Sequence, residues 1–146
     1  MRLEPIKYVR LNAKQKENFN FQKVSAVLAD YGFVTIRLSD DWQGADFIAQ
    51  HVDGTTFLRV QLKSRLAVGK KYRGKDLWVA FYERKTETWY LYPHDELLDQ
   101  ALKTTGIGST VSWLEHGGYS WPDVPEQLRE VLSEYRIAGD TRAAPP

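Results

Sequence analysis

The stretch GADFIAQHVDGTTFLRVQLK, residues 44–63, decides the fold that we expect for this chain. It predicts two strands joined at Asp53-Gly54, because Asp-Gly between strand-forming residues favours a two-residue type I′ loop in which both residues take positive φ. With that loop, the numbers of directly paired residues sum to 107. Asp46 is then expected to lie opposite Gln61.

The two faces of this hairpin differ in chemistry. Side chains alternate along a strand and cross-strand partners share a face, so Asp46, Gln61 and Lys63 are expected together. The opposite face is apolar and carries Phe47, Ala49, Leu58, Val60 and Leu62. An ordinary surface hairpin is also polar on one side, so this pattern alone does not distinguish a functional site from a solvent-exposed sheet.

The composition is that of a folded globular protein. The 146 residues are 42% hydrophobic and 13% aromatic, which is enough for one core. We expect residues 1–138 to form a single domain and residues 139–146 a flexible tail. The absence of cysteine excludes disulfides, thiolate metal sites and a cysteine nucleophile. His51, His94 and His116 form no HxxxH-type pair, so no zinc site is expected.

No apolar run reaches the roughly 18 residues that a membrane-spanning helix needs. The N-terminus also lacks the apolar core of a signal peptide. We therefore expect a cytoplasmic protein that has no membrane partner.

Charge is unevenly distributed, although the net charge is only +1. Residues 63–75 contain basic side chains and no acid: Lys63, Arg65, Lys70, Lys71, Arg73 and Lys75. Residues 115–134 are mainly acidic, with Arg129 as the one basic residue among Glu115, Asp123, Glu126, Glu130 and Glu134. This split predicts a cationic surface beside the hairpin, and an ordinary solvated basic loop is the alternative.

A helix is expected before the hairpin. Asn12 is a good N-cap with Gln15 three residues later, and Gly32 is suited to the C-terminal end. An apolar stripe with helical period runs through Phe21, Val24, Leu28 and Tyr31. Extending that stripe back by four residues leads to Glu17. A carboxylate there is either a site residue or a partly exposed acid near the helix start, where the helix dipole favours negative charge.

Strands are expected at 33–38, 77–82 and 89–92, and a short one within 106–113. In the first, Val34, Ile36 and Leu38 share one side, and Thr35 and Arg37 share the other. The second is apolar almost throughout, which predicts burial on both faces.

Two further helices are expected, from His94 to about Leu102 and from an N-cap at Asp123 to about Tyr135. We interpret His94 as a capping or surface residue. Residues 65–75 are expected to form a loop.

A helix with Glu17, a strand with Asp46 and a strand with Gln61-Leu62-Lys63 resemble, in this order, the PD-(D/E)XK nuclease superfamily. GADFIAQ followed by RVQLKSR is similar to its branch of archaeal Holliday-junction resolvases and restriction-like endonucleases. The resemblance covers residues 12–97. It implies an α/β (α+β) fold, a restriction-endonuclease-like mixed central sheet flanked by helices, and a metal-dependent endonuclease.

The sequence departs from the family pattern twice. Gln61 stands where an acid is usual, and the helix that commonly follows the lysine strand is replaced by the basic loop. An amide oxygen still coordinates a hard cation, but it adds no charge.

The resemblance also implies roles for individual residues. Mg²⁺ or Mn²⁺ would be held by Asp46, Gln61 Oε1, the Leu62 carbonyl and Glu17, and Lys63 would orient or deprotonate the attacking water. Backbone phosphates would be held by Arg65, Lys70, Lys71, Arg73 and Lys75, and Tyr72 would stack on an unpaired base. The implied partner is nucleic acid, DNA in preference to RNA. Because many members of the family act as dimers, a homodimer is compatible with it.

Two alternatives stay open on sequence alone. One is a nucleic-acid-binding module that kept the fold and lost turnover. The other is a protein-interaction module in which Trp113, Tyr119 and Trp121 form a docking surface. The same aromatic residues are equally consistent with a buried core.

Overall fold

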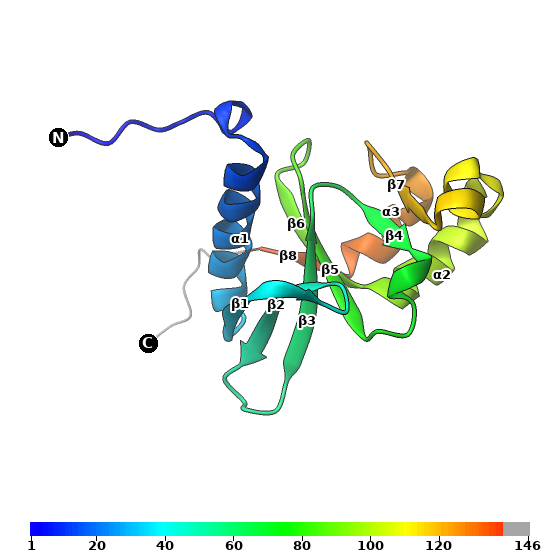
Figure 1. Cartoon of the computed structure of the whole chain (residues 1–146), viewed down its shortest axis with the longest axis horizontal. Helices are drawn as coiled ribbons and strands as arrows, with labels where there is room; N and C mark the ends of the chain where they lie inside the picture. The colour runs from blue at the N-terminus through cyan, green and yellow to red at the C-terminus, as the bar shows by residue number, and fades with distance from the viewer. Residues whose placement is uncertain (139–146) are drawn as a thin grey trace.

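The computed structural model of the chain describes residues 1–138, apart from the side chain of Asp41. Its centre is a six-stranded sheet in the order β1-β2-β3-β5-β6-β8 (Figure 1). The strands are β1 (Phe33–Trp42), β2 (Ala45–His51), β3 (Phe57–Lys63), β5 (Leu77–Glu83), β6 (Thr88–Pro93) and β8 (Arg136–Ile137). Among the strands of the described residues, only β3 and β5 pair in parallel. The predicted mixed sheet flanked by helices is confirmed.

The remaining elements lie around this sheet. A small second sheet pairs β4 (Ala67–Gly69) with β7 (Gly118–Ser120). The helices are α1 (Ala13–Ala29), α2 (His94–Thr104) and α3 (Glu126–Ser133). Short helical turns span Tyr8–Arg10, Lys70–Tyr72, Gly106–Ser109 and Ser112–His116. No helix among the described residues has both the length and the apolarity to cross a membrane.

Helix α1 covers one face of β1–β2–β3, and it begins as predicted. Asn12 accepts a hydrogen bond from the Gln15 amide while the Gln15 side chain accepts one from the Asn12 amide, which forms a capping box. Val24 and Leu28 pack against the apolar face of the hairpin. The predicted separation of an apolar and a polar hairpin face is thereby confirmed.

A second core lies between the sheet, α2 and α3. It contains Leu97, Leu98, Leu128 and Leu132 together with aromatic residues of β5 and β6. Trp113 and Trp121 belong to this core and are each only 8% exposed. They are therefore packing residues, which removes most of the predicted aromatic docking surface.

The two-residue turn expected between β2 and β3 is found instead between β1 and β2. The β2–β3 register is confirmed for Phe47 with Val60 and Ala49 with Leu58, but the ladder ends there and the expected pair of Asp46 with Gln61 is not part of it. The two-residue loop is wrong: the ladder closes with the His51 amide on the Thr56 carbonyl, and Asp53 does not take positive φ. The two-residue turn with two positive φ values is Gln43-Gly44, at 52° and 92°, between β1 and β2.

The two faces of strand β1 are reversed relative to its hydrophobic pattern: the apolar side is exposed and the polar side faces α1. Val34 and Ile36 are 62% and 49% exposed. Thr35 instead donates a hydrogen bond to Ser25 of α1, and Arg37 donates one to Asn18. The side of α1 that meets β1 is polar, so polar residues of β1 face it.

Other differences concern the second half of the chain. The predicted strand within 106–113 is wrong, because this segment forms helical turns. Helix α3 begins at Glu126 with Pro125 rather than Asp123 as its N-cap. His94 is 1% exposed, so its interpretation as a capping or surface residue is also wrong. The tail predicted at 139–146 lies outside the described residues.

Candidate active site

Asp46 lies where the pairing of β1 with β2 becomes irregular. Between the pairs Arg37–Phe47 and Trp42–Ala45, β1 contains residues 38–41 whereas β2 contains Asp46 alone. Such bulges release a residue from the regular ladder and re-aim its side chain. Asp46 Oδ2 accepts a hydrogen bond of 2.8 Å from the backbone amide of Leu62, on the other neighbouring strand.

The edge of β3 beside Asp46 is open at this point. Pairing of β2 with β3 ends at Phe47–Val60, whereas pairing of β3 with β5 continues to Lys63–Phe81. Because the N–H and C=O of one strand residue point to the same edge, the Leu62 carbonyl faces the same opening as its amide. A side chain thus replaces the backbone partner that a regular ladder would supply.

Glu17 of α1 lies beside the same opening. It lines a cavity of about 220 Å³ together with Asp46, and a second cavity of about 260 Å³ together with Leu62 and Lys63. The carboxylate is half exposed and lies 3.6 Å from Lys14 Nζ and 3.4 Å from Arg37 Nη2. Glu17 therefore lies between two cavities, one that it shares with Asp46 and one that it shares with Leu62 and Lys63.

Gln61 is held differently from the other predicted ligands. Its side chain is buried, and Nε2 donates a 2.7 Å hydrogen bond to the Tyr72 hydroxyl. Among the described residues, Gln61 Oε1 is a buried side-chain oxygen without a hydrogen-bond partner. Leaving such an atom unsatisfied costs about 1–3 kcal/mol, so it calls for an explanation.

The oxygen atoms of Asp46, Glu17, Leu62 and Gln61 are chemically suited to a hard cation, and Gln61 lines neither of the two cavities beside Glu17. No three His, Asp or Glu side chains among those described are close enough to hold a metal by themselves. The available oxygens are those of Asp46, Glu17, the Leu62 carbonyl and the unsatisfied Gln61 amide. Mg²⁺ and Mn²⁺ accept such carboxylate, carbonyl and amide oxygens.

Lys63 connects this opening to a larger groove. It lines the cavity beside Glu17 and also a groove of about 470 Å³ that includes Lys70, Lys71 and residues 116–120. Its ammonium nitrogen lies 5.6 Å from the centre of the Tyr72 ring. The Lys63 ammonium group therefore lies where the cavity beside Glu17 meets the larger groove.

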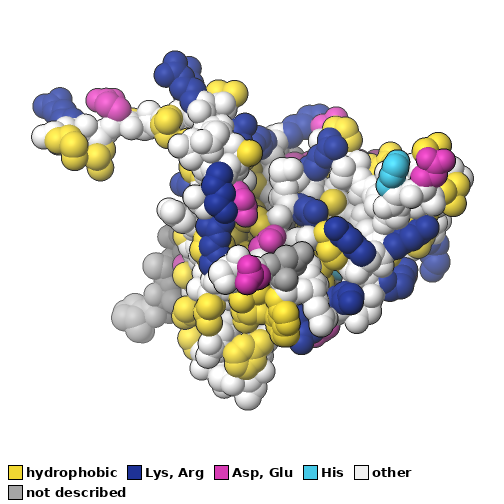
Figure 2. Space-filling model, in the orientation of Figure 1, with side chains coloured by type: hydrophobic (Ala, Val, Ile, Leu, Met, Phe, Trp, Pro, Cys, Tyr) yellow, Lys and Arg dark blue, Asp and Glu magenta, His cyan; other side chains and the backbone are white. Residues whose placement is uncertain are grey.

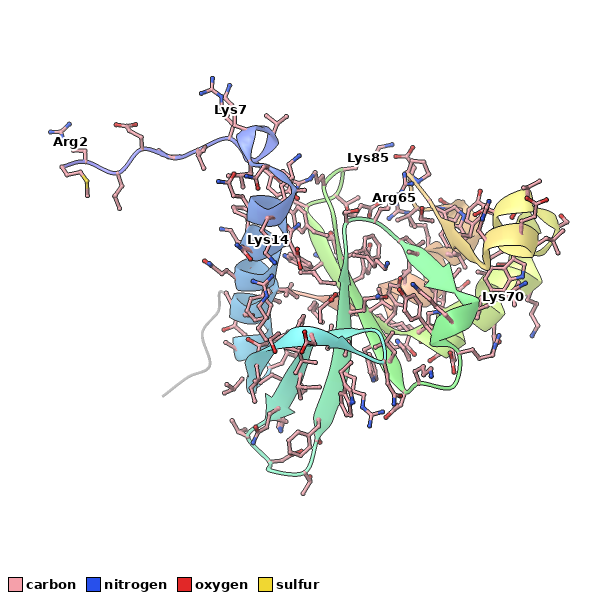
Figure 3. All side chains as sticks on the ribbon, viewed as in Figure 1. Arg2, Lys7, Lys14, Arg65, Lys70 and Lys85 are labelled. Atoms are coloured by element: carbon pink, nitrogen blue, oxygen red, sulfur yellow. The ribbon has the colours of Figure 1, made fainter. Side chains whose placement is uncertain are left out.

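The surface around the groove is rich in basic side chains. Figure 2 shows Lys and Arg side chains spread over this face, on both sides of a small acidic group. In Figure 3, Lys14 projects from α1, whereas Arg65 and Lys70 lie near β4, on the other side of β3 from α1. Arg73 is partly committed to another contact, because it donates a 2.8 Å hydrogen bond to Asp99.

Tyr72 does not offer its ring to a nucleotide base. The residue is only 8% exposed. The ammonium groups of Lys63 and Lys71 lie 5.6 and 5.0 Å from its ring centre. The predicted stacking role does not fit this burial, which makes Tyr72 part of the support beneath the site.

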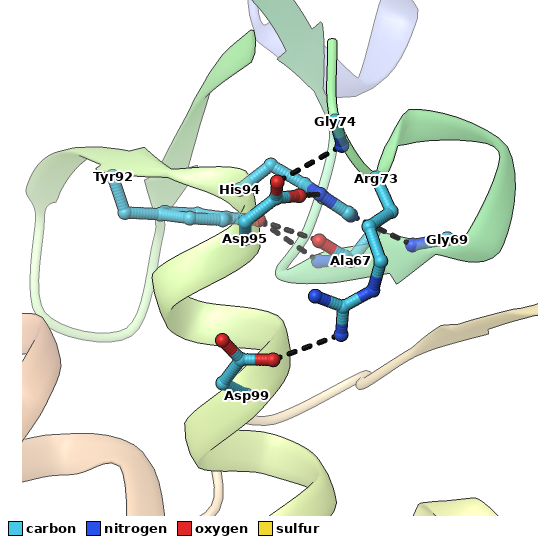
Figure 4. A network of polar contacts seen from close by, with 8 residues as sticks. All are labelled: Ala67, Gly69, Arg73, Gly74, Tyr92, His94, Asp95 and Asp99. Atoms are coloured by element: carbon cyan, nitrogen blue, oxygen red, sulfur yellow. Dashed lines mark hydrogen bonds and ion pairs between the residues drawn. The ribbon is translucent and has the colours of Figure 1, made fainter. Parts of the chain in front are cut away.

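A polar network fixes the basic loop to the start of α2 (Figure 4). His94 Nε2 accepts a hydrogen bond from the Gly69 amide at 3.0 Å, so the proton is on Nδ1, which faces Asp95 Oδ1 at 2.8 Å. Asp95 Oδ2 accepts from the Gly74 amide. Burial lowers the pKa of His94 against the opposing effect of Asp95, which keeps the ring neutral.

Tyr92 secures the other end of the loop, since its hydroxyl donates to the Ala67 carbonyl at 2.7 Å. Burial raises the pKa of Tyr92 and keeps it a donor. Sequence reasoning missed this network and the contact of Arg37 with Glu17. The one sequence signal for the contact of Arg37 with Glu17 was that Thr35 and Arg37 alternate with the apolar residues of the same strand.

Comparison with known proteins gives matches to solved structures only. No protein-family model matches the sequence, and no curated protein matches it. The chain is similar to Archaeoglobus fulgidus Hjc, a Holliday junction resolvase from an archaeal hyperthermophile, with 19% identity and a TM-score of 0.42 over 55% of this chain and 74% of that chain. It is also similar to the bacterial homing endonuclease I-Ssp6803I, with 18% identity and a TM-score of 0.45 over 86% of each chain.

Proposed function

We propose that this protein is a metal-dependent endonuclease that hydrolyses phosphodiester bonds of nucleic acid. The observation that carries the proposal is the break in the ladder beside Asp46, where Asp46 binds the Leu62 amide and Glu17 lines one cavity with Asp46 and a second with Leu62 and Lys63. A carboxylate pair and a lysine at one break in a ladder match the chemistry of phosphodiester cleavage, which needs charge neutralisation and an oriented water.

Each residue has a distinct part in this mechanism. Asp46, the Leu62 carbonyl and Gln61 Oε1 would hold Mg²⁺ or Mn²⁺, with Glu17 beside them. When bound, the cation supplies positive charge against the oxygens of the scissile phosphate. Lys63, as an ammonium group, would orient the attacking water and stabilise the negative charge that develops on the phosphate.

The charge of the site predicts weak metal binding by the free protein. Only Asp46 and Glu17 carry negative charge, and Glu17 already contacts Lys14 and Arg37. Substrate phosphate therefore supplies the missing negative charge, and Mg²⁺ affinity should rise when nucleic acid binds. Isothermal titration with Mg²⁺ measures this directly, and tight binding without nucleic acid would contradict the prediction.

The basic groove beside Lys63 is the proposed path of the substrate. Lys70 and Lys71 line this groove and are exposed, and Arg65 is exposed beside a neighbouring cavity. These side chains would contact backbone phosphates, which positions nucleic acid without reading its sequence. We propose DNA in preference to RNA, following the resemblance. The homodimer and the cytoplasmic location stay predictions.

The proposal is tested by incubating the protein with plasmid, single-stranded DNA, branched DNA and tRNA in Mg²⁺ or Mn²⁺. Lys63→Met should abolish cleavage. Lys103→Met is the matched control, because Lys103 is an exposed lysine of α2 that lines neither the groove nor the two cavities beside Glu17. Equal cleavage by the two variants would contradict a role for Lys63.

A second candidate function is nucleic-acid binding without turnover. It is favoured by Gln61, because an amide at a position where the family has an acid lowers the charge available to hold a cation. Binding of DNA that is unaffected by Mg²⁺ or Mn²⁺, with no cleavage of any substrate, would support this alternative.

A further inference from the structure

Tyr72 contacts three segments that form the candidate site. Its hydroxyl accepts the hydrogen bond of Gln61 Nε2, and its ring lies beneath Lys63. The same ring packs on Gly44, in the turn just before Asp46: a Cβ added to Gly44 would lie 2.9 Å from two ring carbons. One buried side chain thus connects the turn of Asp46 to Gln61 and to Lys63.

The contact with Gln61 matters because the two ends of an amide have opposite chemistry. Nε2 is only a donor and Oε1 is only an acceptor, so a cation binds this side chain only when the amide is oriented with Oε1 toward it. If Nε2 is engaged by Tyr72, Oε1 is the atom left for another partner. The structure shows this arrangement, with Oε1 buried and without a hydrogen-bond partner among the described residues.

The surroundings of the Tyr72 oxygen favour its role as an acceptor. A hydroxyl can donate or accept, and a donating Tyr72 would instead engage Gln61 Oε1. The ammonium nitrogens of Lys63 and Lys71 lie 5.6 and 5.0 Å from the centre of the Tyr72 ring. Neighbouring ammonium groups stabilise negative charge on the phenol oxygen, which strengthens it as an acceptor.

We infer that Tyr72 is a positioning residue of the candidate site: its oxygen holds Nε2 of Gln61 so that Oε1 is presented to a divalent cation. The cation-binding part of this inference rests on the proposed function. A glutamate has two equivalent oxygens and needs no such orientation. The Tyr72 hydroxyl should therefore matter when residue 61 is an amide and lose its importance when residue 61 is a carboxylate.

A double-mutant cycle tests this difference. Tyr72→Phe is made in the natural protein and in Gln61→Glu, and Mn²⁺ affinity is measured by isothermal titration with an uncleavable oligonucleotide bound. We expect Tyr72→Phe to weaken Mn²⁺ binding by about tenfold or more beside Gln61, and by less than about twofold in the Gln61→Glu protein. Thermal unfolding of all four proteins controls for the fold. An equal loss in both backgrounds, as a purely structural role would give, overturns the inference.

A second measurement does not depend on activity. In the metal-free protein, NMR should show slow hydrogen exchange for the Gln61 side-chain NH₂, which Tyr72→Phe should accelerate. The exposed Gln22 of α1 provides the fast reference. Exchange as fast as that of Gln22 overturns the inference even if the protein cleaves DNA. Slow exchange in a protein that neither binds Mn²⁺ nor cleaves supports the Tyr72–Gln61 bond and rejects the proposed function, together with the cation-facing role.

Discussion

The two ends of the β1–β2–β3 meander are built on opposite plans. At the Asp53-Gly54 end, pairing continues to the last residues of the strands, and Asp53 accepts hydrogen bonds from the Thr55 and Thr56 amides. At the Gln43-Gly44 end, the ladder breaks at a bulge, and Asp46 uses a side-chain oxygen to bind the Leu62 amide. We call the Asp53-Gly54 end the closed end, because its hydrogen bonds are local, and the Gln43-Gly44 end the open end, because its ladder is broken.

The difference shows where the chain departs from regular structure. The closed end satisfies its polar groups locally, and the hydrogen bonds from Thr56 hold the pKa of Asp53 far below its usual range. The open end leaves Gln61 Oε1 without a hydrogen-bond partner among the described residues. Irregularities of this kind are enriched beside active sites, so the open end is where function is expected.

The largest expected effect separates the two aspartates of the meander. Asp46→Asn should lower cleavage by about 10²–10³-fold, because removal of a charge-stabilising group from a site has effects of this size. Asp53→Asn should leave cleavage nearly unchanged and lower the unfolding temperature instead. Plasmid cleavage rates and melting curves of the two variants measure both effects. Loss of cleavage in both, or in neither, would remove the functional distinction between the ends.

The two glycines give the next largest effect. Gly44 and Gly54 have φ values of 92° and 78°, so alanine costs about 1–2 kcal/mol of backbone strain at either position. Gly44→Ala adds a clash with the Tyr72 ring, whereas nothing lies within 4 Å of a Cβ on Gly54. We expect Gly44→Ala to be the more destabilising in urea unfolding and to lower cleavage as well. Equal losses of stability would mean that the ring gives way without cost.

A smaller effect concerns substrate binding at the open end. Lys70→Ala combined with Lys71→Ala should weaken DNA binding and reduce the slope of log affinity against log salt by about 1 for each phosphate that the variant no longer binds. Lys103→Ala should leave the slope unchanged. DNA affinities measured between low and moderate salt test this prediction. If the affinity of the natural protein did not depend on salt, the basic loop would have no role in binding phosphates.

The smallest effect is a pH dependence of the support beneath the open end. The folded protein keeps His94 neutral with a lowered pKa, whereas the unfolded chain binds a proton at the ordinary pKa of 6.5. Stability contributed by His94 is therefore complete above pH 6.5 and declines as the pH falls below it. Unfolding curves from pH 7.5 to 5.5 should show this decline. It should be weaker in His94→Gln, and identical slopes would show that His94 is not responsible.

Regular features of the fold could be predicted from the sequence because they depend on local chemistry. The β2–β3 register follows from the position of Asp53-Gly54, since a symmetric loop of two or of four residues gives the same pairs. The capping box follows from Asn12 and Gln15, whose groups are three residues apart. The apolar face of the hairpin follows from the alternation of side chains along a strand.

The irregular features depend on contacts between distant segments. The bulge at 38–41 has no sequence pattern of its own, and the facing of β1 depends on the polar side of α1. The burial of His94 needs the Gly69 amide, and that of Tyr72 needs two glycines close to its ring. The residue types of the site could be predicted, but the support that orients them could not.

The open end of the meander is where we expect a divalent cation to bind. The most direct test is a crystal structure with Mn²⁺ and an uncleavable oligonucleotide, in which anomalous scattering locates the ion. We predict an ion coordinated by the Asp46 carboxylate, the Leu62 carbonyl and Gln61 Oε1. An ion bound elsewhere with this opening empty, or Gln61 presenting Nε2 toward it, would contradict the prediction.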